Sequence, residues 1–277
     1  MAAKRMDLNK RTFCVLSGAT NALGQSLALE LCRRFAQGSL VLLLDENKQQ
    51  LQSLQKKLES ELADSDIESS LTSSPVRFVT GVLVKENAAQ LLEEALKQDE
   101  ANANSFDCAI IVHNEDDVAT QTLLEPQSPL EWTAYVHRQL YAPVALNQRF
   151  LQCPALAGIE KLAVNVTSSL QLRPLIHNSL LCSCKKARDM YFRAMASEEQ
   201  RAGVNVLNYA PGLFATHVEQ YDLNGNLVTL AGLNVNAKLL ALPRVQPQQA
   251  ALKLINILEE ISFVSGHDVD YYDTFVL

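Results

Sequence analysis

The stretch RTFCVLSGATNALGQSLALELCRRF, residues 11–35, joins a short apolar run to a glycine-containing turn and a helical pattern. Residues 11–17 are typical of a buried parallel strand, and the pattern of residues 25–35 is helical. A helix that follows a strand and such a turn offers free N–H groups at its N-terminus, and glycines let a pyrophosphate approach the backbone. The stretch therefore predicts the first phosphate-binding unit of an open α/β sheet.

Strand-like and helix-like segments alternate along the rest of the chain. Six more strands are predicted, at residues 39–44, 76–82, 106–112, 162–167, 204–209 and 263–271, and five more helices, at residues 48–62, 87–96, 129–151, 178–199 and 247–261. This alternation predicts a Rossmann-like, doubly wound α/β fold: a mostly parallel seven-stranded sheet with helices on both faces. No repeat or change of composition marks a boundary, so residues 1–277 are predicted to form one domain.

Two segments between these elements have a different character. Residues 63–75 are acidic and rich in serine, which predicts an exposed connection. Residues 213–245 mix glycines, asparagines and apolar residues without a clear period. A connection of that length usually carries a binding function, so we predict a substrate lid over residues 213–245.

The composition restricts the function. The formal charge of −7 argues against a nucleic-acid or anionic-membrane surface. No apolar run approaches the roughly 20 residues of a membrane helix, and the N-terminus has no apolar core of the length that a secretory signal needs. Six scattered cysteines do not form a disulfide framework, which predicts the reducing cytoplasm. Cys182 and Cys184 lack a second ligand pair, so no metal site is expected.

The glycine turn matches a dinucleotide site at two of three positions. Gly18 and Gly24 occupy the first and last positions of Gly-x-x-x-Gly-x-Gly, and Ala22 occupies the middle one. The alanine methyl takes space where a cofactor comes close and disfavours positive φ angles. The turn is interpreted either as a working dinucleotide site or as a tight turn that packs the helix on the strand.

The end of the second predicted strand bears on cofactor choice. Asp45 there is placed to accept a hydrogen bond from the ribose 2′-OH of NAD. Asp45 and Glu46 would repel the 2′-phosphate of NADP, and Asn21 carries no compensating positive charge. The alternative is that both acids are solvated and cap the following helix.

Four longer strings carry a family resemblance: VTSSL at 166–170, KKARDM at 185–190, LNYAPG at 207–212 with Thr216, and SGHDVDYYD at 265–273. On these strings the chain resembles the short-chain dehydrogenase/reductases, and within them the sepiapterin reductases, over nearly its full length. The resemblance implies a homodimer that uses NADP(H) to reduce carbonyl groups on a pterin side chain, in the last steps of tetrahydrobiopterin synthesis.

The resemblance also implies roles for individual residues. It makes Ser169 the catalytic serine, which holds the substrate, and Lys185 the lysine that binds the nicotinamide ribose. Asp270 matches the acid that anchors the pterin ring. The implied cofactor-binding residues are Gly18, Asn21, Leu23, Gly24, Asp45, Lys185, Pro211, Gly212 and Thr216.

Several family positions hold other residues. The catalytic tyrosine falls on Leu181, and the adenine-contacting aspartate falls on Val82. Residues 112–115, Val-His-Asn-Glu, replace Asn-Asn-Ala-Gly. The basic residues that hold the 2′-phosphate fall on Asn21 and Glu46, and the catalytic-helix asparagine has no match.

Leu181 has the largest consequence. Carbonyl reduction needs an acid that protonates the developing alkoxide, and leucine neither donates nor accepts a proton. Positions 181 and 185 lie four apart on one helical face, so the geometry of the Tyr-x-x-x-Lys pair survives without its phenol. General acid catalysis contributes roughly 10²–10⁴ in rate, so efficient turnover by the family mechanism is not expected.

Three functions follow from this pattern. The prediction is a sepiapterin-reductase-like protein with impaired or lost catalysis, whose binding of NADP(H), or of NAD(H) through Asp45, is weak or lost. The first alternative is an active NADP(H)-dependent carbonyl reductase in which Cys182 or a water donates the proton. The second is a non-catalytic pterin-binding or regulatory subunit. In each case the expected partners are a small pterin or carbonyl compound and a second copy of the chain, with no nucleic acid and no membrane.

Overall fold

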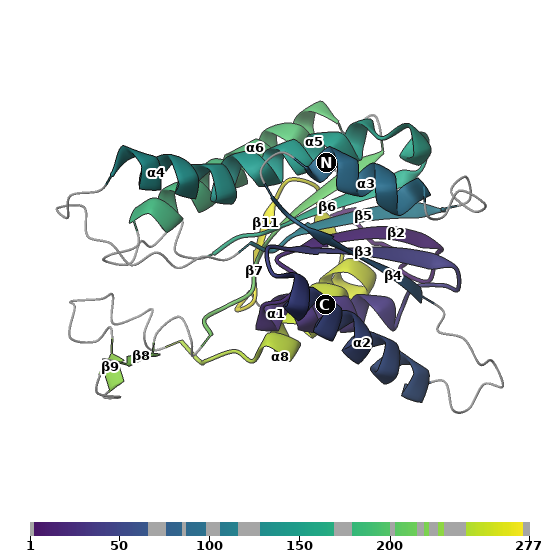
Figure 1. Ribbon diagram of the computed structural model, residues 1–277, viewed down its shortest axis with the longest axis horizontal. Coiled ribbons are helices and arrows are strands. Elements are labelled where there is room, and N and C mark those ends of the chain that lie inside the picture. Colours follow the sequence, from purple (N-terminus) through teal and green to yellow (C-terminus); the bar gives the residue numbers. More distant parts are fainter. Residues whose placement is uncertain are drawn as a thin grey trace.

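A seven-stranded parallel sheet forms the centre of the protein (Figure 1). The computed structural model describes residues 3–65, 76–84, 87–97, 106–115, 128–168, 179–199, 203–214, 219–221, 227–229 and 242–273. The strand order is β11-β7-β6-β5-β2-β3-β4, and every neighbouring pair is parallel. The strands are β2 (Thr12–Ser17), β3 (Ser39–Asp45), β4 (Val76–Val82), β5 (Cys108–His113), β6 (Glu160–Val166), β7 (Val204–Ala210) and β11 (Asp268–Asp270). The predicted Rossmann-like fold is confirmed.

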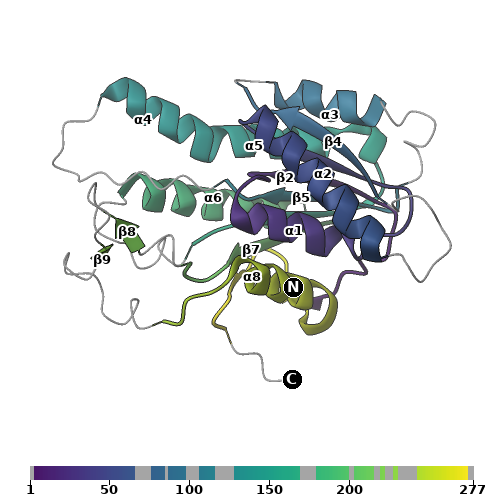
Figure 2. The same cartoon turned by 60° about the horizontal axis from the view of Figure 1, so that its bottom comes forward.

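Helices cover both faces of this sheet (Figures 1 and 2). One face carries α1 (Ala22–Cys32), α2 (Lys48–Ser65) and α8 (Pro247–Asn256). The other carries α3 (Ala88–Lys97), α5 (Ala142–Gln152) and α6 (Ser179–Glu198), and α4 (Pro129–Val136) extends from this layer. In the described part of the chain, no helix is both long and apolar enough to cross a membrane.

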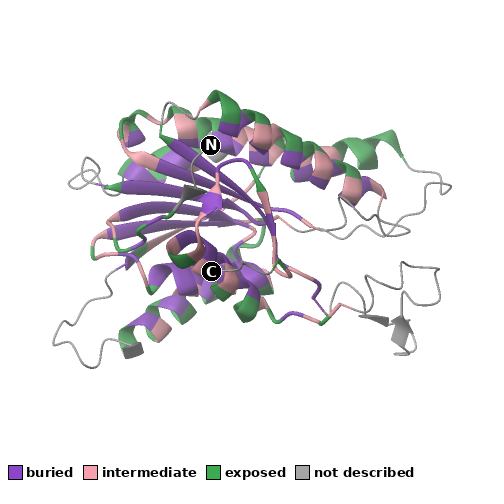
Figure 3. Ribbon diagram, turned by 180° about the vertical axis from the view of Figure 1, so that it is seen from behind, coloured by how far each residue is buried: buried purple, intermediate pink, exposed green. Residues whose placement is uncertain are grey.

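The two helical layers explain why most strand positions are apolar on both faces of the sheet. In β2, Cys14 and Leu16 belong to the core that α1, α2 and α8 share with the sheet. Their neighbours Phe13 and Val15 belong to the opposite core, together with Phe150 of α5. Successive side chains of a strand point to opposite faces, so a strand covered on both sides is largely apolar on both. Figure 3 shows the strands buried between the two layers.

The predicted start of the first helix is wrong by three residues. The α-helix begins at Ala22, because the Asn21 side chain caps it by accepting a hydrogen bond of 2.8 Å from the Gly24 N–H. The predicted long helix at residues 129–151 is present, with a π-helical turn at His137–Tyr141 between α4 and α5. The predicted helix at residues 247–261 likewise ends in a π-helical turn, Ile257–Ile261.

The single strand predicted at residues 263–271 is also wrong. It is divided into β10 (Phe263–Val264) and β11, with Gly266 at φ 85° between them. A positive φ angle reverses the chain and is compatible mainly with glycine. β10 therefore leaves the main sheet and pairs antiparallel with β1 (Ala3–Lys4), while β11 becomes the edge strand beside β7.

The two ends of the predicted lid lie side by side. The Val245 N–H donates to the Leu213 carbonyl over 2.9 Å. The Tyr272 hydroxyl accepts from the Leu213 N–H at 3.0 Å and donates to the Pro243 carbonyl at 2.6 Å. Between these ends the structure describes only a small hairpin, β8 (Glu219–Tyr221) and β9 (Leu227–Thr229), so a role as lid stays a prediction. Of the predicted connection at 63–75, residues 63–65 belong to α2 and residues 66–75 lie outside the described part.

Candidate cofactor and active site

The glycines of the first turn are required by contacts within the protein. Gly18 has φ 63°, and a Cβ there would lie 2.3 Å from the Asn114 carbonyl oxygen. A Cβ on Gly24 would lie 2.2 Å from the Gly18 carbonyl oxygen. The turn therefore touches the carboxyl end of β5 on one side and the first turn of α1 on the other, backbone against backbone.

A pair of asparagines fixes this turn from both sides. The Asn114 side chain donates to the Gly18 carbonyl over 2.9 Å and to the Asn21 side-chain oxygen over 3.0 Å. In return, the Asn21 side chain donates to the Asn114 carbonyl over 3.1 Å. Sequence reasoning treated residues 112–115 as a lost motif and missed this role of Asn114. The available signal was a short amide side chain directly after a buried strand that neighbours the glycine turn.

Gly18→Ala is expected to lower the free energy of unfolding by about 2–4 kcal/mol, because it combines a strained positive φ angle with overlap at Asn114. Gly158→Ala is the matched control: Gly158 has φ 77°, but nothing lies within 4 Å of its added Cβ. The control should lose only about 1 kcal/mol. Urea denaturation of both variants measures the difference, and equal losses would show that the contact with Asn114 has no energetic role.

Asp45 at the end of β3 is already engaged with the turn. Its Oδ2 accepts from the Thr20 N–H at 2.9 Å and from the Thr20 hydroxyl at 2.7 Å, and its Oδ1 accepts from the Glu46 N–H at 2.7 Å. A carboxylate has about four acceptor positions, so one remains for a ribose hydroxyl. The cap of α2 is a different residue, Asn47, whose side chain accepts from the N–H groups of Gln49 and Gln50.

The start of α1 can hold an anion. By helix geometry the N–H groups of Ala22 and Leu23 have no acceptor within the helix. The Ala22 methyl is exposed at this end, whereas the Leu23 side chain lies in the core, so only the backbone of Leu23 can contact a ligand. This end of the site fits a pyrophosphate, apart from the extra methyl of Ala22.

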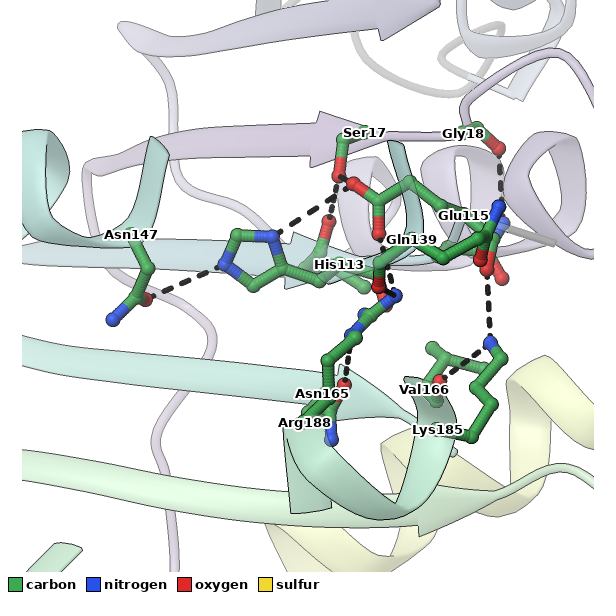
Figure 4. A network of polar contacts seen from close by, with 12 residues as sticks. Ser17, Gly18, His113, Glu115, Gln139, Asn147, Asn165, Val166, Lys185 and Arg188 are labelled. Carbon is green, nitrogen blue, oxygen red and sulfur yellow. Dashed lines mark hydrogen bonds and ion pairs between the residues drawn. The ribbon is translucent and has the colours of Figure 1, made fainter. Parts of the chain in front are cut away.

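Lys185 is bound to the main chain at the carboxyl ends of two strands (Figure 4). Its Nζ donates to the Glu115 carbonyl over 2.8 Å and to the Val166 carbonyl over 3.1 Å, and the residue is 3% exposed. One helical turn earlier, Leu181 is also buried, so no hydroxyl stands beside the ammonium at that position. The end of the site that would receive a nicotinamide ribose therefore differs from the family pattern.

Glu115 and Arg188 form a buried ion pair next to Lys185, which Figure 4 shows. Arg188 Nη1 lies 3.1 Å from Glu115 Oε2, with side-chain exposures of 0% and 16%. Arg188 also donates from Nε to Asn165 Oδ1 at 3.1 Å and from Nη2 to the His113 carbonyl at 3.2 Å. The Ser17 hydroxyl donates to Glu115 Oε1. The added hydrogen bonds from Arg188 and to Glu115 Oε1 offset part of the desolvation cost of this pair.

The charge state of Glu115 follows from these contacts. Burial alone would raise the pKa of Glu115, but the Arg188 guanidinium, with contributions from His113 and Ser17, holds that pKa well below the usual carboxyl range. Glu115 is thus an anion and cannot replace the missing tyrosine as a proton donor. Sequence reasoning missed this pair, although Arg188 lies three residues after Lys185 on the same helical face.

Two further ionisable side chains, His113 and Tyr191, lie close to this network. His113 is fully buried, with Nδ1 3.9 Å from Glu115 Oε1 and Nε2 3.4 Å from Asn147 Oδ1. Tyr191 lies farther along the same chain of contacts, its hydroxyl 3.4 Å from Asn147 Nδ2, and burial raises the pKa of Tyr191. Both side chains thus belong to a chain of polar contacts that runs from Glu115 through Asn147 to Tyr191.

The predicted residues Pro211, Gly212 and Asp270 lie at the ends of β7 and β11. Gly212 has φ 86°, and a Cβ there would meet Val245 Cγ2 at 2.6 Å, so glycine is needed for close packing against the start of α8. Pro211 beside it is buried. Asp270 ends β11, paired in register with Ala210, and its Oδ1 accepts from the Tyr272 N–H at 3.0 Å.

Two predicted site residues cannot be placed. Ser169 and Thr216 lie outside the described residues. The structure brings five of the predicted residues to the carboxyl ends of the central strands β2, β3, β5 and β6: Gly18, Asn21, Gly24, Asp45 and Lys185. Three others lie at the ends of β7 and β11: Pro211, Gly212 and Asp270. Within the described ranges, no group of three or more metal-ligating side chains occurs.

A strand, glycine turn and helix lie at the centre of a parallel sheet, with a helical lysine at the neighbouring strand ends, which is the arrangement expected of a short-chain dehydrogenase. Residues 12–225 match the short chain dehydrogenase family, and the chain belongs to that family.

Similar proteins point to one group within it. The chain is 28% identical to sepiapterin reductase of Xenopus laevis, over 99% of this chain and 100% of the relative. It is 30% identical to sepiapterin reductase of Xenopus tropicalis, over 94% of this chain and 96% of the relative. It is 29% identical to sepiapterin reductase of Bos taurus, over 95% of this chain and 95% of the relative. The resemblance read from the four strings is confirmed.

Proposed function

We propose that this protein is a sepiapterin-reductase-like member of the short-chain dehydrogenase family in which carbonyl reduction is impaired. The observation that carries the proposal is the pair formed by Leu181 and Lys185. Leu181 supplies no proton, and the Lys185 ammonium is bound to the carbonyls of Glu115 and Val166. In a site where developing negative charge must be neutralised, these are the two positions that matter most.

The two ends of the site fit a dinucleotide to different extents. A bound nicotinamide cofactor would supply the hydride, and the α1 N-terminus with Gly18 and Gly24 fits its pyrophosphate. The nicotinamide end departs from the family pattern, because the phenol is missing at Leu181, while two of the three N–H donors of Lys185 are used by main-chain carbonyls. Steady-state NADPH oxidation with sepiapterin, beside the Xenopus laevis relative under the same conditions, tests the proposal. Comparable rates would refute it.

A second function, ligand binding without turnover, is supported by Asp270. This carboxylate lies at the carboxyl end of the edge strand, beside the end of β7, and is half-buried. A charged acceptor at this edge is suited to the N–H groups of a pterin ring, because a hydrogen bond to a charged group is roughly twice as strong as a neutral one.

Asp270→Asn is expected to weaken the binding of a pterin about tenfold or more, since it removes the charge from that hydrogen bond. Asp268→Asn on the same strand is the control, because Asp268 pairs with Arg193 of α6 instead. Titration calorimetry with sepiapterin measures both. Unchanged heats for Asp270→Asn, or an equal loss of pterin affinity in the two variants, would contradict the proposal that Asp270 anchors a pterin.

We further propose a cytoplasmic homodimer. None of the six cysteines, all of which lie in the described part of the chain, forms a disulfide, as expected in a reducing compartment. Large apolar side chains are exposed on neighbouring helices: Leu130 and Trp132 on α4, Tyr141 in the π-helical turn and Met190 on α6. Exposed apolar side chains on neighbouring helices are typical of a surface that another subunit covers.

A further inference from the structure

The turn that follows β11 gives the Asp270 carboxylate a defined orientation. Asp270 Oδ1 accepts a hydrogen bond from the Tyr272 N–H at 3.0 Å. The Asp270 N–H donates to Asp273 Oδ2 over 2.9 Å, and the Asp273 N–H donates to the Asp270 carbonyl over 3.0 Å. The direction in which this carboxylate points therefore depends on where the main chain of Tyr272 lies.

The side chain of Tyr272 fixes that position from outside the turn. Its hydroxyl accepts from the Leu213 N–H at 3.0 Å and donates to the Pro243 carbonyl at 2.6 Å. Burial raises the pKa of Tyr272, so the hydroxyl keeps the proton that it donates at neutral pH. One phenol thus joins the chain that follows β7 to the chain that precedes α8, and both of them to the Asp270 turn.

Tyr271 holds the same turn in a different way. Its N–H donates to the Ala210 carbonyl over 2.8 Å, which continues the pairing of β11 with β7. Its ring lies edge-on to that of Tyr272, with the ring centroids 5.4 Å apart. Among the described residues, the Tyr271 hydroxyl has no hydrogen-bond partner. Tyr271 therefore acts through its main chain and its ring, whereas Tyr272 acts through its hydroxyl.

We propose that Tyr272 is a positioning residue that couples ligand binding at Asp270 to the two ends of the 213–245 segment, at Leu213 and Pro243. The bonds that fix the Tyr272 hydroxyl also fix its N–H, and thereby the carboxylate that receives the ligand. Because coupling between two sites is reciprocal, a ligand that favours this orientation of Asp270 also stabilises the bonds at Leu213 and Pro243. The inference rests on the proposed binding of a pterin at Asp270.

Amide hydrogen exchange of the full chain without ligand, resolved by NMR, tests the positioning role. In Tyr272→Phe, the amides at positions 213 and 272 should exchange at least about fivefold faster than in the wild type, because the hydroxyl that holds both is gone. Tyr271→Phe is the matched control and should change these rates less than about twofold. Amides of β2 should keep their wild-type rates in both variants.

Two outcomes of the exchange experiment would contradict the proposal. Faster exchange at position 213 alone would show that the hydroxyl joins the segment ends without setting the Asp270 turn. Faster exchange throughout β2 as well would show a general loss of structure in place of a positioning role.

Titration calorimetry with sepiapterin tests the coupling. Tyr272→Phe should weaken sepiapterin binding about fivefold or more, and Tyr271→Phe less than about twofold. In the wild type, bound sepiapterin should slow the exchange of the Leu213 amide. Unchanged affinity in Tyr272→Phe would overturn the coupling. A wild type that binds no sepiapterin would refute the proposed pterin binding instead, while the exchange rates without ligand still decide whether Tyr272 positions Asp270.

Discussion

Glu115→Gln is expected to lower the free energy of unfolding by about 3–5 kcal/mol, one of the two largest effects that we expect. The substitution keeps size and shape but leaves the Arg188 guanidinium, which is 0% exposed, without its carboxylate. Breaking one side of a buried ion pair is far more destabilising than the net contribution of the pair, because the remaining charge is buried and uncompensated.

Urea denaturation at neutral pH measures this loss, with Glu61→Gln as the matched control. Glu61 lies 3.9 Å from Lys57 on the surface of α2, with exposed fractions of 36% and 56%. An exposed pair of this kind contributes roughly 0–1 kcal/mol. A loss below about 1 kcal/mol for Glu115→Gln would mean that the pair is not buried in solution.

The same comparison has a predicted pH dependence. Arg188 lowers the pKa of Glu115 in the folded protein. As the pH falls, Glu115 is therefore protonated in the unfolded chain at a higher pH than in the folded protein. The stabilisation by ionised Glu115 is therefore complete above the unfolded carboxyl pKa of about 4.3, and it is lost as the pH falls below that value. The difference between wild type and Glu115→Gln should shrink on acidification.

Sepiapterin reduction is expected to be slower by about 10²–10⁴ than in a relative with the catalytic tyrosine, the range that general acid catalysis contributes. In the described part of the site, Leu181 is apolar, Glu115 is held as an anion and His113 is fully buried beside it. None of these three side chains is suited to give a proton to an alkoxide at the strand ends.

Cys182 is the remaining stand-in from the first alternative, three residues before Lys185 and partly exposed. If it supplied the proton, Cys182→Ala would abolish residual turnover. We expect Cys182→Ala to leave the residual rate unchanged within about twofold, because a residual rate without a general acid depends on orientation and binding alone. A larger drop would assign the role to the thiol.

Most of the fold could be predicted because the sheet is covered on both faces. Complete burial makes β2, β5 and β7 largely apolar, and such runs stand out between polar connections. The errors fell where a single residue decides the geometry. Asn21 starts α1 earlier than the leucine pattern does, and Gly266 divides the last strand.

The candidate site was less predictable, because its contacts join segments far apart in sequence. The absence of a phenol at Leu181 could be predicted, because positions 181 and 185 lie within one helix. The bond from Lys185 to the Glu115 carbonyl, the ion pair of Glu115 with Arg188 and the hold of Asn114 on Gly18 depend on how β5 meets α6 and the turn. No periodicity encodes which charges will meet across a sheet edge.

A single-turnover experiment tests the central claim most directly, because it separates hydride transfer from cofactor binding and product release. Protein in excess over sepiapterin is mixed with saturating NADPH, and the decay of sepiapterin absorbance is followed beside the Xenopus laevis relative. With Leu181 in the place of the tyrosine, the rate constant should be at least about 100-fold lower than in the relative. A rate constant within tenfold of the relative would contradict the account.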